Sequence, residues 1–349
     1  MTPPGIADEW IDRLEHDLDI AQSTKRPRSK RRPDHASAVA ARVIGVDRGR
    51  YSLVLIDPPH TAVRANRARE LRNDAIVVGD LVDVVGDVSG QEGTLGRIVR
   101  IHERRNVLRR SADDTDQFER VIVANADQLL MVVAVANPEP RPRLIDRYVV
   151  AALDAGIEPI LCVTKTDLGT AEALREYASG LDIPVLSLRN DGGPDDLPAL
   201  RALLRDKVSV AVGHSGVGKS TLVNRLVPHA QREVGVVNEA TGRGRHTSSS
   251  SVSLALPDGG WIIDTPGVRS FGLGHVSPDA IDRGFPDLAD FLARCPRGCE
   301  HLAELSDCGL SEHLTSGNAS EREAARIDSL QRLRQLAGSG DHQGSSGRE

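Results

Sequence analysis

The sequence lacks the features that mark membrane and secreted proteins. Its longest uninterrupted apolar run, residues 129–136, is far shorter than the roughly 18 residues that a membrane-spanning helix needs. The first residues include acids where a secretory signal would have a basic start and an apolar core. Only four cysteines occur in 349 residues, which argues against a disulfide framework. We therefore expect a globular, cytoplasmic protein of two or three domains that binds no membrane.

Aromatic residues are also scarce, at 3% of the chain, and the charge is unevenly distributed. The net charge of −6 conceals a basic block, because residues 24–110 hold 19 bases and 10 acids. Such a block inside an acidic chain is typical of a polyanion partner, although a solvated charged surface is the alternative. Tyr51 is its only aromatic residue, whereas proteins that bind single strands rely on aromatic platforms. The block therefore favours folded RNA, recognised through phosphate and shape.

The first half of the chain predicts two segments. Residues 1–37 combine an acidic amphipathic helix with a disordered basic arm. Residues 38–110 hold short β-rich runs separated by turn residues. These runs cover residues 40–46, 51–56, 80–85 and 95–101. Strands of this length and spacing predict a five-stranded RNA-binding barrel, for which an OB-fold is favoured and an SH3-like barrel is the alternative.

The second half predicts three more segments, which are an α/β domain over residues 111–275, a smaller module over 276–337 and a flexible tail over 338–349. In the α/β domain we expect strands over residues 128–135, 160–163, 184–188, 207–212, 251–256 and 261–264. A helix is expected over residues 142–155, and another over 320–336 in the smaller module. Apolar strands alternating with helices indicate a parallel sheet that is covered on both faces.

A phosphate-binding loop is the most specific motif. It consists of Gly213, His214, Ser215, Gly216, Val217, Gly218, Lys219 and Ser220, and the helix that follows it begins near Thr221. Glycines allow consecutive backbone N–H groups to surround phosphates at a helix N-terminus. Lys219 is then expected to neutralise the β- and γ-phosphate oxygens, and the Ser220 hydroxyl to hold Mg²⁺.

Two further motifs specify the nucleotide. Asp264 ends an apolar strand and begins an Asp-Thr-Pro-Gly motif, so its carboxylate is expected to reach Mg²⁺ through water while the Gly267 N–H faces the γ-phosphate. Another apolar strand ends in Thr164, Lys165, Thr166 and Asp167. A carboxylate there can accept from guanine N1–H and the exocyclic amine, donors that adenine lacks. The three motifs together predict GTP binding rather than ATP binding.

A cysteine and histidine cluster lies in the smaller module. It comprises Cys295, Cys299, His301 and Cys308, which are four soft ligands within fourteen residues. This composition predicts one tetrahedral Zn²⁺ site. Because no open coordination position is evident, we expect the zinc to be structural. The fourth cysteine of the chain, Cys162, lies in an apolar strand and is expected in the core.

The order of the motifs resembles that of circularly permuted GTPases, because residues 164–167 precede residues 213–220, and these precede residues 264–267. With a small barrel before them and the cysteine cluster after them, residues 38–310 resemble the bacterial ribosome small-subunit-dependent GTPase A family. The resemblance includes residues 104–109, 124–127 and 145–148.

The resemblance implies further site residues. Residues 242–248 are similar to the first switch of the family, so Thr247 or Ser248 would sense Mg²⁺ and the γ-phosphate. The segment from Ser187 to Arg189 would give the guanine ring a backbone contact. Thr164 stands where the family commonly has Asn, which predicts a modest affinity for guanine.

The resemblance also implies how hydrolysis is catalysed. Val268 occupies the position where many GTPases have a water-orienting Gln, and an aliphatic side chain cannot orient water. Hydrolysis by the protein alone is therefore expected to be slow. His246 is the candidate catalytic residue, positioned when a partner orders the switch.

These patterns predict a circularly permuted P-loop GTPase domain with an N-terminal OB-like barrel and a C-terminal zinc-binding helical module. The resemblance implies a monomer that binds GTP and GDP with Mg²⁺, the small (30S) ribosomal subunit and 16S-type rRNA, and that hydrolyses GTP during late subunit maturation. Two alternatives remain open: a nucleotide-dependent zinc metallochaperone, and an RNA-binding module with a vestigial nucleotide pocket.

Overall fold

The structure is a computed structural model that describes residues 37–58, 61–110, 120–191, 193–228, 251–265, 271, 273, 276–301 and 307–338. The chain divides into two units, Met1–Ser37 and Ala38–Glu349, and nearly all described residues belong to the second. The predicted acidic helix, the basic arm and nearly all of the C-terminal tail lie outside the described residues. Among the helices that are described, none is long and apolar enough to cross a membrane.

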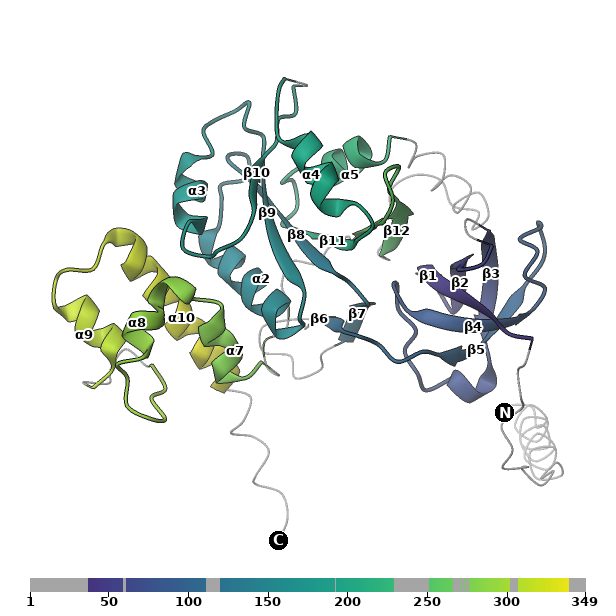
Figure 1. Cartoon of the computed structure of the whole chain (residues 1–349), viewed down its shortest axis with the longest axis horizontal. Helices are drawn as coiled ribbons and strands as arrows, with labels where there is room; N and C mark the ends of the chain where they lie inside the picture. The colour runs from purple at the N-terminus through teal and green to yellow at the C-terminus, as the bar shows by residue number, and fades with distance from the viewer. Residues whose placement is uncertain are drawn as a thin grey trace, which may run out of the picture. The chain divides into compact units, whose positions relative to one another are not determined.

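The N-terminal part of the second unit is a five-stranded barrel (Figure 1). Its strands are β1 (Val39–Asp47), β2 (Arg50–Leu55), β3 (Ala62–Arg67), β4 (Leu81–Gly86) and β5 (Gly96–Ile101). Antiparallel pairing joins β1 to β2 and β2 to β3, β5 then pairs parallel to β3, and β4 closes the barrel against β1. This closure is that of an OB-fold and not of an SH3-like barrel. The barrel prediction is confirmed.

A short strand pair follows the barrel. It consists of β6 (Val107–Arg110) and β7 (Arg120–Ala124), which pair antiparallel. The junction before it is fixed by Arg104, whose guanidinium binds both carboxylate oxygens of the fully buried Asp80 at 2.7 and 2.8 Å. The Asn125 side chain accepts from the Arg105 N–H and donates to the carbonyl of Gly79. These contacts connect the barrel directly to the segment that enters the next sheet.

The α/β region contains six strands in the order β10-β9-β8-β11-β13-β12. They are β8 (Gln128–Ala134), β9 (Glu158–Thr164), β10 (Val185–Ser187), β11 (Val208–Val212), β12 (Val252–Ala255) and β13 (Trp261–Asp264). All are parallel except β12, which runs antiparallel to β13. One antiparallel pairing, Gly45 with Val252, also joins β12 to β1. All six predicted strands are present, with ends that differ by at most two residues.

Helices cover both faces of this sheet, as Figure 1 shows. They are α2 (Pro142–Asp154), α3 (Glu172–Ala178), α4 (Leu197–Leu204) and α5 (Lys219–Leu226). Alternate side chains along β8 belong to two different cores: Met131 packs in the core that includes α2 and α3, and Val132 packs in the core that includes α4 and α5. Every residue of β8 is buried, which explains why its sequence is continuously apolar after Gln128.

The C-terminal module is helical. It contains α7 (Pro278–Arg283), η2 (Pro286–Leu288), α8 (Ala289–Leu292), α9 (Gly309–Thr315) and α10 (Glu321–Gly338). Fully buried Arg326 on α10 binds Asp146 of α2 and, at 2.9 Å, Asp287 of η2, and its guanidinium lies 4.2 Å from the centre of the Phe285 ring. The Tyr177 hydroxyl on α3 also donates to Asp146. The module is therefore joined to the α/β region through a buried ionic network.

Candidate nucleotide and metal sites

The phosphate-loop motif connects β11 to α5. Gly213 directly follows the strand, and a Cβ at this position would lie 2.4 Å from the carbonyl oxygen of Val132, so β8 leaves no room for a side chain. Gly218 has φ +95° and caps the N-terminus of α5, a conformation that favours glycine. The loop therefore has a strand before it, glycines at the close approach and the turn, and a helix N-terminus after it.

Lys219 and Asp264 lie together at the base of this loop. The Lys219 ammonium donates to the carbonyl of Thr265 at 2.8 Å and lies 3.7 Å from Asp264 Oδ1. Burial lowers the pKa of Lys219, and the Asp264 carboxylate opposes this shift. Burial likewise raises the pKa of Asp264, against the effect of Lys219. A lysine partly removed from water beside a single carboxylate can still bind phosphate oxygens strongly.

The same site has donors that suit Mg²⁺. Asp264 Oδ1 is buried and has no hydrogen-bond partner among the described residues, although it lies beside Lys219. The Ser220 side chain is exposed at the start of α5. Oxygen donors of this kind are those that Mg²⁺ prefers, usually together with water and substrate phosphates. The residues present therefore fit a nucleotide-bound magnesium ion.

The base-recognition motif begins at the end of β9. Thr164 is 2% exposed, and its hydroxyl donates to the carbonyl of Val217 in the phosphate loop. The Lys165 ammonium donates to the carbonyl of Asn137. Asp167 Oδ1 accepts from the backbone N–H of Asn190 at 2.9 Å. The strand that carries the base motif thus touches the phosphate loop directly.

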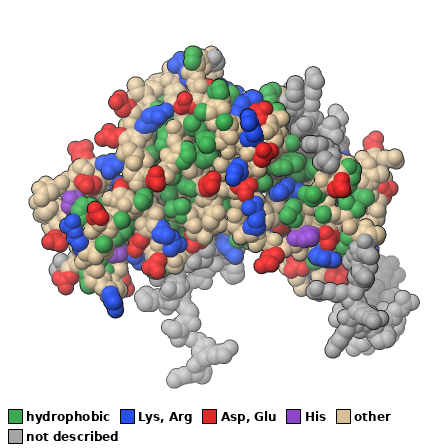
Figure 2. Space-filling model, viewed as in Figure 1, with side chains coloured by type: hydrophobic (Ala, Val, Ile, Leu, Met, Phe, Trp, Pro, Cys, Tyr) green, Lys and Arg blue, Asp and Glu red, His purple; other side chains and the backbone are tan. Residues whose placement is uncertain are grey.

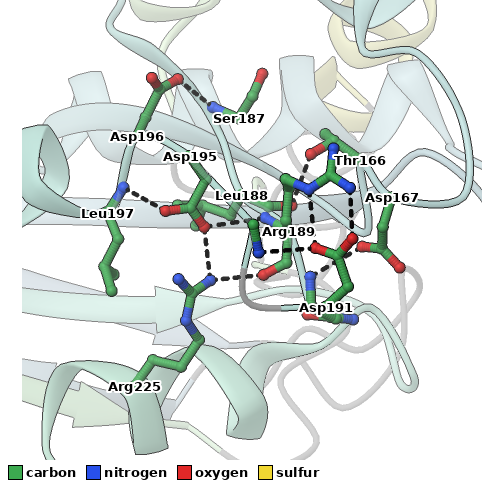
Figure 3. Close-up of polar contacts among 12 residues, drawn as sticks. Thr166, Asp167, Ser187, Leu188, Arg189, Asp191, Asp195, Asp196, Leu197 and Arg225 are labelled. Carbon is green, nitrogen blue, oxygen red and sulfur yellow. Dashed lines mark hydrogen bonds and ion pairs between the residues drawn. The ribbon is translucent and has the colours of Figure 1, made fainter.

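The segment from Ser187 to Arg189, at the end of β10, is held by hydrogen bonds from two parts of the chain, as Figure 3 shows. The Ser187 N–H donates to Asp196 Oδ2 at 2.7 Å, and the Thr166 N–H and hydroxyl donate to the carbonyl of Leu188. The Arg189 N–H donates to Asp195 Oδ2 at 3.1 Å. The backbone expected to face guanine therefore has a defined position next to Asp167.

The other predicted nucleotide residues lie in the phosphate loop, at the start of α5, or outside the described residues. Val217 is buried, whereas Ser215, Gly216 and Thr221 are exposed, and His214 Nδ1 lies 3.2 Å from the carbonyl oxygen of Ser215. Four predicted residues lie outside the described residues: His246, Thr247, Ser248 and Gly267. Their roles stay predictions.

The four predicted metal ligands are close together. Ligand atoms of Cys295, Cys299, His301 and Cys308 all lie within 4.8 Å of one another. Cys308 Sγ lies 4.0 Å from Cys295 Sγ and 3.8 Å from His301 Nδ1. A tetrahedral zinc ion with bonds of ~2.0–2.3 Å separates its ligand atoms by about 3.3–3.8 Å. The cluster therefore fits a zinc ion with only small adjustments.

The surroundings of the cluster also suit zinc. His301 is 5% exposed, and Asp282 Oδ2 lies 3.7 Å from its Nε2, which leaves Nδ1 on the side of the cysteines. A carboxylate on the far nitrogen commonly orients a zinc-binding histidine. Burial opposes ionisation of Cys308, but backbone N–H groups of α9 and the His301 ring outweigh it and lower the pKa of this thiol to about 7. Thiolates are the form that binds zinc.

The barrel carries a moderate excess of positive charge. Residues 38–110 contain 13 arginines and nine acids. Ten of the arginines are exposed, and eight of these lie within the barrel strands and their loops, residues 39–101: Arg48, Arg50, Arg64, Arg67, Arg69, Arg72, Arg97 and Arg100. Basic and acidic side chains are interspersed on the face drawn in Figure 2. The rest of the predicted basic block, residues 24–36, lies outside the described residues.

The order of the strands along the chain defines the class of protein, which is a circularly permuted GTPase. Strand β9, which ends in the predicted base motif, precedes strand β11, which leads into the phosphate-loop motif, and β8 lies between them in one parallel sheet. The model of the RsgA GTPase family matches residues 101–274. The small ribosomal subunit biogenesis GTPase RsgA of Shewanella oneidensis is 37% identical over 296 residues, which cover 80% of this chain and 81% of that protein. The chain belongs to the RsgA GTPase family.

Other comparisons agree with this family. The protein of the same name from Ectopseudomonas mendocina is 44% identical over 203 residues, a match that spans 56% of this chain and 58% of that relative. The crystal structure of YjeQ from Thermotoga maritima has a TM-score of 0.64 and 24% identity, covering 86% of this chain and 98% of its own. YloQ, described as a circularly permuted GTPase, has a TM-score of 0.61 and 22% identity, covering 88% and 98%. At these identities the two structures show the fold alone.

The motifs did not reveal three residues that shape the site. Asp195 and Asp196 hold the segment after β10, and Arg225 on α5 contacts both Asp195 and the carbonyl of Arg189. Two acids just before a helix are a common helix-start pattern, so the sequence signal for Asp195 and Asp196 was ambiguous. No local pattern distinguishes Arg225 from other helix-surface arginines.

Proposed function

We propose that the protein binds GTP with Mg²⁺ and hydrolyses it to GDP and phosphate. One observation carries this proposal: the phosphate loop, Asp264 and the Asp167 segment meet at the same edge of the sheet. This edge is formed by the carboxyl ends of the parallel strands β9, β11 and β13, which is where nucleotides bind in open α/β sheets. The hydrogen bond from Thr164 to Val217 supports a single continuous site.

Each group has a role in this proposal. Backbone N–H groups of the loop and the Lys219 ammonium bind the phosphates, and Asp167 accepts from the guanine N1–H and exocyclic amine. Ser220 and Asp264 are the residues that would hold Mg²⁺, directly and through water. The ion would supply positive charge next to the phosphates. Because Lys219 is already partly removed from water, little solvent has to reorganise when phosphate binds.

Hydrolysis by the protein alone is proposed to be slow. Val268 follows the Asp-Thr-Pro-Gly motif and cannot orient the attacking water. His246 is proposed to supply this function once a partner orders the first switch, with Thr247 or Ser248 sensing Mg²⁺ and the γ-phosphate. The Gly267 N–H is proposed to face the γ-phosphate.

The proposed partner is the small (30S) ribosomal subunit. The relatives are named as small ribosomal subunit biogenesis GTPases, and the barrel of this chain has eight exposed arginines for phosphate contacts with 16S-type rRNA. The protein would act as a cytoplasmic monomer during late subunit maturation. The zinc ion would be structural, because two of its four ligands are buried and all four are protein side chains.

Phosphate release from GTP, with and without purified small subunits and at two salt concentrations, tests the proposal. We expect slow release by the protein alone, faster release with subunits, and a smaller stimulation at high salt because phosphate contacts are salt-dependent. Equal rates under all four conditions would contradict the subunit as partner. Full stimulated turnover in His246→Ala would separately contradict the role of His246.

A further inference from the structure

A single peptide group lies between the base-recognition aspartate and the phosphate-binding helix. The carbonyl of Arg189 and the N–H of Asn190 belong to the same planar unit. The N–H donates to Asp167 Oδ1 at 2.9 Å, and the carbonyl accepts from Arg225 Nη1 at 2.7 Å. In a trans peptide these two bonds point in opposite directions, so fixing one fixes the other.

Arg225 is itself fixed by an ion pair. The same Nη1 lies 2.7 Å from Asp195 Oδ2, as Figure 3 shows. Asp195 is also held through its backbone partners, because Oδ2 accepts from the Arg189 N–H at 3.1 Å and Oδ1 from the Leu197 N–H at 3.1 Å. The N–H and the carbonyl of Arg189 are thus both bound by one ion pair. The side chains of Asp195 and Arg225 are 5% and 26% exposed, so water screens the pair only partly.

The pair connects two parts of the site that are distant in sequence. Arg225 lies in the last turn of α5, the helix that begins at Lys219 of the phosphate loop. Asp195 precedes α4 and follows the segment expected to face guanine. The two residues therefore join the element that binds phosphate to the loop that orients Asp167.

We propose that the Arg225–Asp195 ion pair is a positioning contact for guanine recognition, which orients the Asp167 carboxylate through the peptide group between Arg189 and Asn190. The inference rests on the proposed function, since it assumes that Asp167 accepts from guanine. Each carboxylate oxygen has two acceptor positions, so the bond from Asn190 leaves Asp167 able to accept from the base. Without Arg225 this peptide can rotate, and Asp167 loses the donor that orients it.

Binding of three ligands separates positioning of the base from binding of phosphate. Calorimetry with Mg²⁺ measures the dissociation constants of GDP, ADP and inorganic tripolyphosphate for the full chain, for Arg225→Gln, for Asp195→Asn and for the double variant. In each variant we expect about tenfold weaker GDP binding, the effect of one hydrogen bond to a charged group. Binding of ADP and tripolyphosphate should change less than about twofold. The double variant should lose no more than either single variant, because the two residues act as one unit.

Arg201→Gln is the matched control. Arg201 lies nearby on α4 and donates to the backbone carbonyl of Arg225 at 2.8 Å, with a side chain that is 34% exposed. Among the contacts of the described residues it has none with the Arg189 peptide group or Asp167. It should retain the selectivity for GDP over ADP. Retained tripolyphosphate binding shows that each variant keeps a folded phosphate site.

The outcomes distinguish this inference from the proposed function. If the unaltered protein binds GDP and ADP equally, the proposed guanine specificity is wrong. If the unaltered protein prefers GDP and both single variants keep this preference in full, the positioning role of Arg225 and Asp195 is wrong. A parallel loss of GDP and tripolyphosphate binding also contradicts it, because the pair would then support the general fold.

Discussion

Charged residues at the nucleotide site are held partly out of water, and their partners determine what they can do. Lys219 has the carbonyl of Thr265 and the carboxylate of Asp264 beside it. Neither contact neutralises the lysine completely. The carbonyl is uncharged, and burial raises the pKa of Asp264 and so opposes its ionisation. A phosphate group brings more negative charge and more acceptors than these partners. In the proposed function, a phosphate oxygen would therefore replace the Thr265 carbonyl as the partner of Lys219 when nucleotide binds.

The Asp195 carboxylate has a testable effect on stability at different pH values. Burial alone would raise the pKa of Asp195, but Arg225 and two backbone N–H donors outweigh it and hold the pKa below its ordinary value. A carboxyl group whose pKa is lower in the folded than in the unfolded state stabilises the fold at pH values above its unfolded pKa of about 4. This stabilisation is lost as the pH falls through the pKa of the folded state. Asp195→Asn should therefore lower the free energy of unfolding by about 1–3 kcal/mol at pH 7.

Denaturant unfolding of the unaltered protein and Asp195→Asn, measured in parallel from pH 7 down to the lowest pH at which both fold, checks this prediction. The difference between the two proteins should be constant near neutral pH and should shrink on acidification. A difference that grows as the pH falls would show that Asp195 is not stabilised as an anion.

Elements of the α/β region and the C-terminal module are connected by the network around Arg326. This side chain is fully buried and reaches Asp146 on α2 and Asp287 on η2. Arg326→Met removes the cation and leaves two carboxylates without their main partner. Breaking a buried ion pair from one side costs about 3–5 kcal/mol. We expect a loss of this size in the free energy of unfolding, measured with denaturant.

Arg332→Met on the same helix is the matched control. Arg332 is 58% exposed and pairs with Asp328 one turn away. Exposed pairs of this kind contribute less than about 1 kcal/mol. If Arg326→Met is as mild as Arg332→Met, the network does not stabilise the contact between the module and α2.

Secondary structure was predictable wherever hydrophobic pattern dominated. β8 and β11 are continuously buried and were found almost to the residue. β3 was not predicted because Val63 is its only large apolar residue, and its inward positions are otherwise filled by Ala65. β6 and β7 were also missed, since the four residues of β6 include two arginines and its partner lies ten residues away. Strands of this kind are specified by pairing across the fold rather than by local pattern.

The candidate sites were predictable to the extent that their residues are adjacent in sequence. The phosphate loop, the residues from Thr164 to Asp167 and the cysteine cluster are compact motifs, and the structure brings the described members of each together. The contacts that orient them are not compact. Asp195 and Arg225 are 30 residues apart, and Asp146 and Arg326 are 180 apart. A single sequence does not show which of its many arginines meets which aspartate.

The described residues form a barrel, an α/β region and a C-terminal helical module. The barrel has its own core, whereas the zinc module packs on the α/β region through the core shared with α2 and α3. The proposed boundaries at residues 37, 110, 275 and 337 remain predictions. The proposed zinc ion would stabilise the connection between α8 and α9, because all four of its ligands lie within this connection.

Removal of the metal tests the structural role of zinc. The full chain should contain one zinc per molecule, and Cys308→Ala should release it and lower the thermal midpoint of unfolding. Cys162→Ala is the control with the same substitution, because Cys162 is buried in β9 and belongs to a different core. Metal analysis and circular dichroism check both variants. Full zinc content in Cys308→Ala, or loss of zinc in Cys162→Ala, would contradict the assigned ligands.

Calorimetric titration of the full chain with GTP and with ATP, both in the presence of Mg²⁺, tests guanine-specific nucleotide binding most directly. We expect one binding site per chain and at least about tenfold tighter binding of GTP, since a site that binds the guanine edge leaves its carboxylate unpaired with adenine. Lys219→Ala should weaken GTP binding by about ten- to a hundredfold, the effect of losing hydrogen bonds to charged oxygens. No heat with GTP, or equal affinity for ATP, would contradict a guanine-specific phosphate-loop site.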